Sequence, residues 1–435
     1  MKQENTYRIL MILENLAYPE DSRVMLEANA LQAAGHSVTV ICPTSKKCKR
    51  KFELIDDIKV YRYPAPLEFD GVLGYVWEFA YSFAMAWMIS FYVFMRFGFD
   101  VIHIHMPPDL NGFLGIFYRM LGKKFVMDHH DLSPELFSAK GKENGILKRL
   151  LLFFEKTSCR WAHRLIATNQ SQRDVQINRC GATEDHCFIV RNGPADFFME
   201  PQTPVDYGND PQTKVIGYVG VMGVQDGVDV LIRALDYLKR ELGRDDFLGV
   251  LIGNGPSTEE LKALTTELGL ENNTVFPGFV PFEEVPTYIA GFDICATPDP
   301  INDYNNSCTT IKTMEYMALG KPTISFNTVE NQKTAGNSAV YVGSDCNPEL
   351  FARAILELME DTERCLRLGQ LGRERIESGL AWDFQQTELI RLYESFSSEG
   401  IRPAFKNLEP KDNDKNTMDC HIQFDLASSN KVSQR

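Results

Sequence analysis

Apolar runs alternate with amphipathic stretches along most of the chain. Residues 9–13 are apolar without interruption, as expected for a parallel strand that is covered on both faces. Apolar residues then repeat at helical spacing behind two candidates for a helix N-cap, Asp21 and Ser22. Gly35 stands where a helix commonly ends in a left-handed residue, and residues 37–42 are the next predicted strand. The pattern predicts a strand, a helix and a strand of the Rossmann type.

The same unit recurs further along the chain. The other predicted strands are residues 100–105, 124–127, 164–168, 187–190, 214–220, 247–253, 274–276, 293–297 and 322–326. The other predicted helices are residues 228–242, 257–268, 283–290, one that begins near Asn306 or Ser307, and 348–359. An irregular stretch near residues 199–212 divides the two series of units. We therefore expect two doubly wound domains, residues 1–198 and 213–380, that face each other across a cleft and are joined by the linker 199–212.

The most hydrophobic stretch is residues 72–97, and residues 79–95 contain no charge. Its length is at the short limit for a membrane span. A span here would put consecutive Rossmann strands on opposite sides of a membrane, so we favour a helix that is buried or lies at an interface. Its aromatic residues, together with the basic residues in 46–51 and 148–149, keep peripheral membrane contact through this domain open.

Composition and charge narrow the partners. The net charge of −14 is uneven: residues 1–199 hold 24 basic and 22 acidic side chains, and residues 200–435 hold 21 and 37. The acidic part argues against nucleic acid as a partner. The ten cysteines form no CxxC pair, which argues against a zinc site and a disulfide framework. With no signal peptide evident, we expect a cytoplasmic protein, either free or peripheral at the inner face of the membrane. The polar residues 400–435 are expected to be a disordered tail.

Candidate chemistry gathers at NNSCTTIKTMEYMALGKPTI, residues 305–324. A helix that is capped here directs its first backbone N–H groups and its positive dipole end at a potential anion. Thr309, Thr310 and Lys312 can add donors and charge. Glu315 can accept hydrogen bonds from two neighbouring hydroxyls, which a ribose diol supplies. The alternative is that Lys312 and Glu315 form a solvated surface pair.

Several stretches together resemble a known family. MEYMALGKPTISF, GYVGVMGVQDGVDVLIRAL, LIGNGP, VFPGFVPFEEVPTYIAGFDICATP and IVRNGPADFF are similar to the donor side of the retaining glycosyltransferases of family 4. DSRVMLEANALQAAGHSVTVICP, DVIHIHMPPD and MDHHDLSPELF resemble the acceptor-side domain of that family. The resemblance covers roughly residues 7–398. It implies the GT-B fold, with two facing Rossmann-like domains and a terminal helix, here residues 381–399, that crosses back to the first domain.

The resemblance also implies transfer of a hexosyl or N-acetylhexosaminyl group from a nucleotide diphosphate sugar, with retention and without a metal or other cofactor. The expected acceptor is a lipid-linked or growing glycan in polysaccharide biosynthesis. Family members carry two glutamates separated by seven residues. Glu315 matches the second, which contacts the ribose, whereas Ser307 stands at the first. The chain therefore resembles the subset that lacks the first glutamate.

A second departure concerns the diphosphate. The family often has an Arg and a Lys near the glycine loop of the donor domain, and Val221 and Asp226 stand at those positions. We expect Lys312 and the backbone N–H groups near Gly220, Met222 and Gly223 to compensate. Other donor-side candidates are Ser307, Thr309, Thr310 and Gly253, the last within LIGNGP; Arg23 and Arg191 are further sources of positive charge.

His130 matches the histidine that faces the donor sugar in the family. Imidazole suits this place because it can donate to a sugar hydroxyl or stabilise charge as the diphosphate leaves. Asp131 or Asp128 is expected to orient it. His105 ends a strand and is an acceptor-side candidate, together with Arg23. His103 is expected to be structural, and we expect no metal at these histidines, since two rings two residues apart on a strand share a face in any case.

Retention without a nucleophilic carboxylate fits a front-face reaction, in which the departing phosphate oxygen accepts the acceptor's proton and the protein supplies positive charge and positioning. Two alternatives remain open on the same fold: a nucleotide-sugar epimerase, and a non-catalytic subunit that binds a nucleotide sugar. A dinucleotide oxidoreductase is disfavoured because no G-x-G-x-x-G motif opens the first helix.

Overall fold

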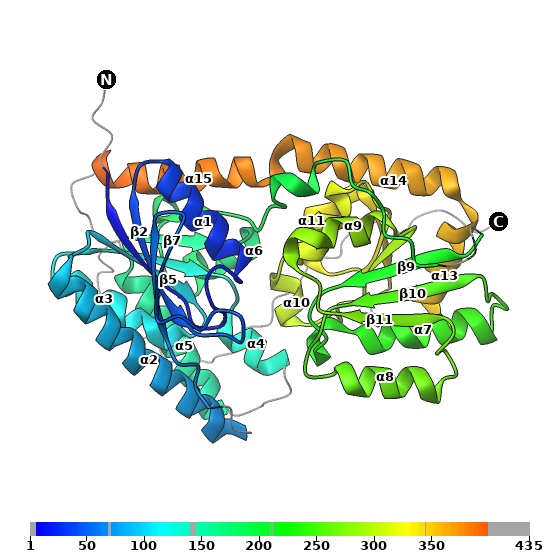
Figure 1. Cartoon of the computed structure of the whole chain (residues 1–435), viewed down its shortest axis with the longest axis horizontal. Helices are drawn as coiled ribbons and strands as arrows, with labels where there is room; N and C mark the ends of the chain where they lie inside the picture. Colours follow the sequence, from blue (N-terminus) through cyan, green and yellow to red (C-terminus); the bar gives the residue numbers. More distant parts are fainter. Residues whose placement is uncertain are drawn as a thin grey trace, which may run out of the picture. The chain divides into compact units, whose positions relative to one another are not determined.

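The computed structural model describes residues 6–67, 71–139, 145–208, 210, 212–343 and 345–398, all of which belong to one compact unit. The predicted tail, residues 400–435, and two positions of the predicted linker lie outside the described residues. Two largely parallel sheets with helices on both faces form the fold (Figure 1). The predicted α/β class with two Rossmann-like layers is confirmed.

The first sheet has the strand order β3-β4-β2-β1-β5-β6-β7-β8. Its strands are β1 (Arg8–Ile12), β2 (Ser37–Pro43), β3 (Phe52–Ile55), β4 (Ile58–Tyr63), β5 (Val101–Met106), β6 (Lys124–His129), β7 (Arg164–Ala167) and β8 (Cys187–Ile189). Only the edge strand β3 is antiparallel, in a hairpin with β4. The sequence analysis did not anticipate this hairpin, which turns at Asp56 and Asp57 with φ of 46° and 63°.

The second sheet has the strand order β11-β10-β9-β12-β13-β14 and is parallel throughout. Its strands are β9 (Lys214–Val219), β10 (Phe247–Ile252), β11 (Thr274–Gly278), β12 (Ile294–Thr297), β13 (Thr323–Phe326) and β14 (Ala339–Val342). The direction of winding reverses between β9 and β12. Doubly wound sheets bind ligands outside the carboxyl ends of the strands at such a reversal.

Helices cover both faces of each sheet. Those of the first sheet are α1 (Ser22–Ala33), α2 (Gly71–Arg96), α3 (Gly112–Met120), α4 (Ser133–Ala139), α5 (Gly145–Trp161) and α6 (Gln170–Asn178). Those that follow are α7 (Val228–Arg240), α8 (Thr258–Glu267), α9 (Val285–Ala290), α10 (Asp303–Ser307), α11 (Ile311–Ala318), α12 (Val329–Ala335), α13 (Pro348–Glu360), α14 (Thr362–Arg375) and α15 (Trp382–Ser398). Asp21 caps α1 by accepting from the Val24 N–H at 3.1 Å, and Gly35 has a φ of 88°, as predicted.

The last helix, α15, returns to the first sheet. Leu389, Leu392 and Tyr393 are buried there in one core cluster with residues of β1 and α1, such as Met11 and Leu31. The opposite face of the sheet packs against α2 and α3. One face of the first sheet is therefore covered by α15, as the family resemblance implied (Figure 1).

The helix predicted to start near Asn306 begins later. Asn302 caps the separate short helix α10 by accepting from the Asn305 N–H, and Cys308 is extended, so the chain turns before α11 starts at Ile311. The N-cap of α11 is Thr310, whose side chain makes no capping bond. Neither Asn306 nor Ser307 caps this helix, so that prediction is wrong. Ile311, the first residue of α11, is 37% exposed.

Candidate functional site

Lys312 and Glu315 are both buried, with 8% and 6% of their surface exposed. The alternative of a solvated surface pair is therefore wrong. Both lie in the first turns of α11, which begins at the carboxyl edge of the second sheet and is buried at every position from Lys312 to Ala318. Two ionisable side chains that the fold buries at a helix start need partners or a ligand.

Lys312 lies between two carboxylates. Its Nζ is 2.9 Å from Asp299, 3.7 Å from Asp226 and 3.3 Å from the hydroxyl of Tyr218. Burial lowers the pKa of Lys312, but Asp299, Tyr218 and Asp226 more than offset it and leave the pKa well above its usual value. Burial raises the pKa of Asp226 to about 6. Lys312 is therefore a cation that already forms ion pairs with Asp299 and Asp226 in the absence of a ligand.

Glu315 lines a small cavity of about 20 Å³ together with Arg23, Asn192 and Trp382. The cavity joins α11 to α1 and to the segment after β8, so Glu315 faces the first sheet's half of the molecule. Burial raises the pKa of its carboxyl to about 7, and Lys312 lowers it in part. A volume of this size admits about one water molecule, so a nucleotide requires the space to widen.

The glycine loop after β9 is held internally. The N–H of Gly220 donates to Ile252, that of Met222 to Asn254, and that of Gly223 to the carboxylate of Asp226. These three N–H groups, which were predicted to bind phosphate, are therefore already hydrogen-bonded within the protein in this structure. A Cβ on Gly253 would come within 1.9 Å of the Gly220 carbonyl, so Gly253 is needed for close packing of the two strand ends.

The polar loop before α11 lies against the first half of the molecule. Asn169, at the start of α6, donates to the carbonyl of Ser307 at 2.9 Å and to the hydroxyl of Thr309 at 3.0 Å. The Ser307 hydroxyl donates to the Tyr304 carbonyl, and that of Thr310 bonds Thr313 and Asn331. These side chains fix the loop's shape, and their contact with a donor stays a prediction.

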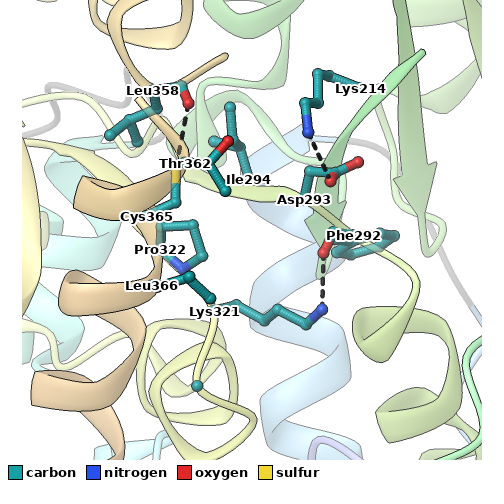
Figure 2. A pocket seen from close by; sticks show the side chains of 11 residues that line it. Lys214, Phe292, Asp293, Ile294, Lys321, Pro322, Leu358, Thr362, Cys365 and Leu366 are labelled. Atoms are coloured by element: carbon teal, nitrogen blue, oxygen red, sulfur yellow. Dashed lines mark hydrogen bonds and ion pairs between the residues drawn. The ribbon is translucent and has the colours of Figure 1, made fainter. Parts of the chain in front are cut away.

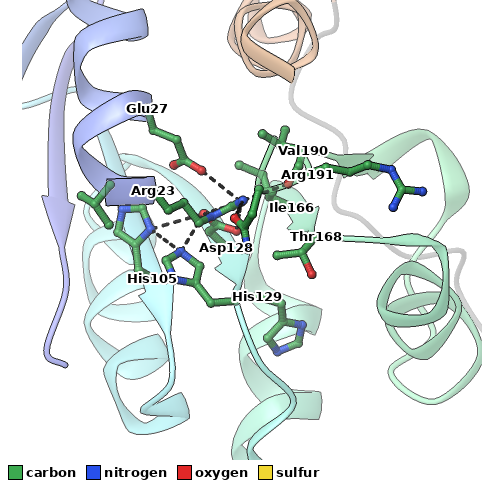
Figure 3. A network of polar contacts seen from close by, with 12 residues as sticks. Arg23, Glu27, His105, Asp128, His129, Ile166, Thr168, Val190 and Arg191 are labelled. Carbon is green, nitrogen blue, oxygen red and sulfur yellow. Dashed lines mark hydrogen bonds and ion pairs between the residues drawn. The ribbon is translucent and has the colours of Figure 1, made fainter. Parts of the chain in front are cut away.

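His130 follows β6 at the carboxyl edge of the first sheet. Its Nε2 lies 2.9 Å from Nδ1 of His105 and 3.2 Å from the carboxylate of Asp128 (Figure 3 shows His105 and Asp128). Among the hydrogen bonds of the described residues none uses Nδ1 of His130, which is the ring nitrogen left to meet a ligand. Asp128 is therefore the residue that orients His130.

Asp131 points elsewhere. It accepts from the hydroxyl of Tyr304 at 3.1 Å and from the thiol of Cys308 at 3.7 Å. Asp131 therefore links the first sheet's half to the loop before α11. The sequence analysis offered it as one of two residues that could orient His130, and it does not contact that ring. His105, the acceptor-side candidate, is only 2% exposed, and its Nδ1 contacts His130.

Arg23 and Arg191, the two further candidates for positive charge, differ sharply. Arg23 is buried, and its guanidinium contacts the side chains of Asp128, Glu27 and Asn192 and the carbonyl of Val190. All its nitrogens are engaged in this structure, and its predicted contact with an acceptor or phosphate stays a prediction. Arg191 points away from that cluster (Figure 3). Its Nη1 is buried without an acceptor among the described residues, and burial lowers its pKa.

The cluster around Arg23 also contains potential metal ligands. Atoms of Glu27, His103, His105 and Asp128 lie within 4.8 Å of one another, and all four side chains are buried. Arg23 lies 3.0 Å from Glu27 and 2.9 Å from Asp128 and supplies the positive charge that both carboxylates need. The His103 and His105 rings stack at 4.5 Å, and Nδ1 of His103 is 3.0 Å from the Tyr393 hydroxyl, which fits a structural role for His103.

A larger cavity, of about 190 Å³, lies at the amino ends of β9, β12 and β13 (Figure 2). Its polar groups are paired: Lys321 donates to the carbonyls of Ala290 and Phe292, and Lys214 pairs with Asp293. The cavity is at the amino edge of the sheet. Lys312 and Asp299 meet at the opposite, carboxyl edge, outside the winding reversal. The cavity belongs to the support of the sheet and not to the candidate site.

The sequence analysis missed three residues of the site. Asp299 and Tyr218 contact Lys312, and Glu330 of α12 is buried between Ser171 and Thr309. An acidic residue two positions after the predicted strand 293–297 was the available signal for Asp299. Glu330 was missed because its pair with Lys333, three residues on, looks like an ordinary surface pair of a helix, while its partners Ser171 and Thr309 lie 159 and 21 residues away along the chain.

Comparison with known proteins identifies the fold and the family. The model described as "Glycosyltransferase Family 4" matches residues 22–194, and the model "Glycosyl transferases group 1" matches residues 200–375. The GDP-mannose-dependent alpha-(1-6)-phosphatidylinositol monomannoside mannosyltransferase of Mycobacterium tuberculosis is 29% identical over 165 residues, which are 36% of this chain. The match covers 41% of that relative, so the chain spans well under half of its length there.

Two solved structures extend the likeness over most of the chain. Sucrose-phosphate synthase from Thermosynechococcus elongatus superposes with a TM-score of 0.74 at 19% identity, covering 90% of this chain and 99% of that one. Anabaena HepE in complex with UDP and glucose gives 0.64 at 16% identity, covering 90% and 100%. The two family models adjoin and together account for nearly all of both sheets, and the structural matches share the same two-sheet architecture. The chain thus belongs to the glycosyltransferases of family 4 and has the GT-B fold.

Proposed function

We propose that this protein transfers a sugar from a nucleotide diphosphate sugar to a glycan or lipid-linked acceptor, with retention of configuration. The observation that carries the proposal is the position of Glu315, which is buried at the start of α11 and lines the cavity shared with Arg23 and Asn192. A carboxylate held there can accept both hydroxyls of a ribose. The named relative uses GDP-mannose, and HepE binds UDP and glucose.

The donor's diphosphate would lie over the start of α11. The helix dipole contributes about 0.3–2 kcal/mol to binding an anion there. Lys312 is engaged by Asp299 and Asp226, so it must turn from a carboxylate to a phosphate when the donor binds. Arg191 supplies the second cation in this proposal: a buried guanidinium N–H that lacks an acceptor gains one from a phosphate oxygen.

In the transfer step the bond from the sugar C1 to the phosphate oxygen breaks, and the bond from the acceptor oxygen to C1 forms on the same face. The acceptor's proton passes to the departing phosphate oxygen, so the protein needs no base. His130, held through Nε2 by Asp128 and His105, presents Nδ1 to the sugar. Lys312, Arg191 and the α11 start stabilise the charge that grows on the phosphate. Ser307 takes the place of the family's first glutamate and can hydrogen-bond a sugar hydroxyl.

One observation favours a second function. Two carboxylates, Asp226 and Asp299, surround the single positive charge of Lys312. Ser307 cannot act as a carboxylate. Both features suit a subunit that binds a nucleotide sugar without turning it over. Such a protein would bind a donor and release no nucleoside diphosphate with any acceptor.

A donor panel separates these functions. Thermal shift with UDP-, GDP- and dTDP-sugars should show selective stabilisation by one nucleotide class, since a ligand that binds the native state raises the unfolding temperature by mass action. Release of nucleoside diphosphate with a glycan or polyprenyl-linked acceptor should then follow. Stabilisation without release on any acceptor supports the binding subunit, and release that needs no acceptor and yields an epimer supports the epimerase.

A further inference from the structure

The long helix α2 exposes an apolar face that the transfer reaction does not use. Its inner stripe, Ser82, Ala86, Ser90 and Val93, is buried at spacings of three to four residues. The opposite stripe carries Trp77, Trp87, Phe91 and Tyr92, each 44–54% exposed. On α5 of the same side, Phe153 and Trp161 are 57% and 41% exposed. We call these six exposed aromatic residues the aromatic face.

Partly buried rings of α3 lie between the two helices that carry the aromatic face, and all three helices lie on one side of the first sheet (Figure 1). The rings of Trp87 on α2 and Phe117 on α3 are 6.3 Å apart, and those of Phe113 on α3 and Phe154 on α5 are 5.5 Å apart. Between residues 76 and 95 the sequence has a single charge, Glu78. Contiguous apolar surface of this kind marks a site of interaction with a partner or a membrane.

Polar bonds tie the inner stripe of α2 to the rest of the fold. Ser82 donates to Glu14 at 3.0 Å, and the Tyr118 hydroxyl donates to Ser90 at 2.9 Å. Residues 76–96 are long and apolar enough to cross a membrane, with 22% of the most apolar window buried. A crossing would break these bonds and expose a stripe that packs on the sheet. The helix is therefore held with only its outer side available.

Basic side chains border the aromatic face. Arg96 and Lys59 lie over the ring of Phe97 at 5.3 and 5.1 Å, Lys123 lies over Phe94, and Arg119 lies over Trp161. Lys148, Arg149 and Lys156 are exposed on α5. Residues 1–199 carry a small net positive charge, 24 basic against 22 acidic side chains, whereas the rest of the chain is strongly acidic. Aromatic side chains with a basic border are the composition that binds the headgroup region of anionic membranes.

We propose that the aromatic face docks on a lipid bilayer with anionic headgroups, with α2 and α5 lying in the plane of the interface. The inference does not depend on the donor site. One consequence does rest on the proposed function. α2 and α5 run antiparallel to the strands that follow them, so both begin at the carboxyl edge of the sheet, where His130 lies. A docked molecule thus holds its site next to acceptors anchored in the same bilayer.

Vesicle flotation of the full chain without any donor tests the docking. Wild type should float with vesicles of phosphatidylcholine and phosphatidylglycerol, and less with phosphatidylcholine alone or at high salt. Trp87→Ser with Phe91→Ser should weaken binding to both compositions by roughly tenfold or more, and Arg96→Glu with Lys123→Glu should remove the preference for phosphatidylglycerol. Leu366→Ser is the matched control, since Leu366 is 71% exposed on α14 of the other half.

Three results would overturn the proposal. The first is wild type that stays free of both kinds of vesicle, or aromatic variants that float as wild type does. The second is a dimer in sedimentation equilibrium that the Trp87 and Phe91 changes abolish, which would make a second copy the occupant. The third is wild type that alkaline carbonate cannot extract, which would make α2 a span. Because no donor is present, a failed transfer assay leaves this readout unaffected.

Discussion

At the residue scale the site depends on charges that the fold has buried before a ligand binds. Glu315 and Asp226 both have raised pKa values, about 7 and about 6, because burial disfavours their ionised forms. Lys312 stays charged between Asp299 and Asp226. The site thus titrates near neutral pH, although its residues are ones that ordinarily titrate far from it.

The first prediction concerns Glu315. Its carboxyl is mostly protonated at pH 6 and mostly ionised at pH 8, and only the ionised form accepts hydrogen bonds from both ribose hydroxyls at full strength. Nucleotide affinity should therefore rise about tenfold over this range, since a charged hydrogen bond contributes about 1.5–3 kcal/mol and a neutral one about 0.5–1.5. Isothermal titration calorimetry of wild type and Glu315→Gln measures the difference.

Asp226 opposes this trend, because its ionisation near pH 6 repels a diphosphate. The informative quantity is thus the part of the pH dependence that Glu315→Gln removes, and Asp226→Asn serves as the control. An unchanged pH profile in Glu315→Gln would show that this carboxyl does not contact the nucleotide.

The second prediction separates the two arginines. Arg191→Gln should weaken nucleoside diphosphate binding about tenfold or more with little change in stability, because its Nη1 has no acceptor to lose within the described part of the chain. Arg23→Gln should instead lower the free energy of unfolding by about 3–5 kcal/mol, because it leaves Asp128 and Glu27 buried without their cation. Urea unfolding and calorimetry on both variants check this. Equal losses of stability would contradict the assignment.

At the element scale the sequence predicts regular structure better than it predicts ends and edges. The uninterrupted apolar run at β1 predicts a buried parallel strand, because no polar residue alternates with its apolar ones. The start of α11 was misplaced because Asn302, and not Asn306 or Ser307, takes the capping role and forms the separate helix α10. The β3–β4 hairpin was missed because its turn, Asp56-Asp57, contains no glycine.

The third prediction concerns α15, which returns from the second sheet to the first. The Tyr393 hydroxyl lies 3.0 Å from His103 in a fully buried position. Tyr393→Phe leaves the ring in place and removes the bond, so the free energy of unfolding should fall by about 0.5–1.5 kcal/mol. The urea midpoint measures this. Tyr237→Phe on α7, whose hydroxyl contacts only exposed groups, should leave the midpoint unchanged, and an equal fall in both variants would count against the link.

At the scale of the whole molecule, the order of strands and helices was enough to predict two Rossmann-like layers and the GT-B fold. The domain boundaries stay predictions. Of the predicted site residues, Lys312, Glu315 and His130 lie at the carboxyl edges of the two sheets, whereas Arg23 and His105 are buried among other polar side chains. Their partners come from elements far apart in the chain, such as Arg23 and Asp128, 105 residues apart, so no local pattern could reveal them.

Contacts between the two halves of the molecule also depend on distant residues. Asn169 reaches Ser307 and Thr309, and Asp131 reaches Tyr304, across separations of more than 130 residues. Together with the small cavity beside Glu315, these bonds describe a closed arrangement that a nucleotide sugar must open. Such opening is a common part of turnover in enzymes whose sites lie between two layers.

The most direct test of the account follows the anomeric proton of the product by nuclear magnetic resonance during turnover of the preferred donor, with wild type and Glu315→Gln side by side. We expect wild type to release nucleoside diphosphate and to form a product with the donor's anomeric configuration, and Glu315→Gln to lose about tenfold or more in kcat/KM. An inverted product, or a Glu315→Gln protein as active as wild type, would contradict the central claim that the start of α11 holds the donor of a retaining transfer.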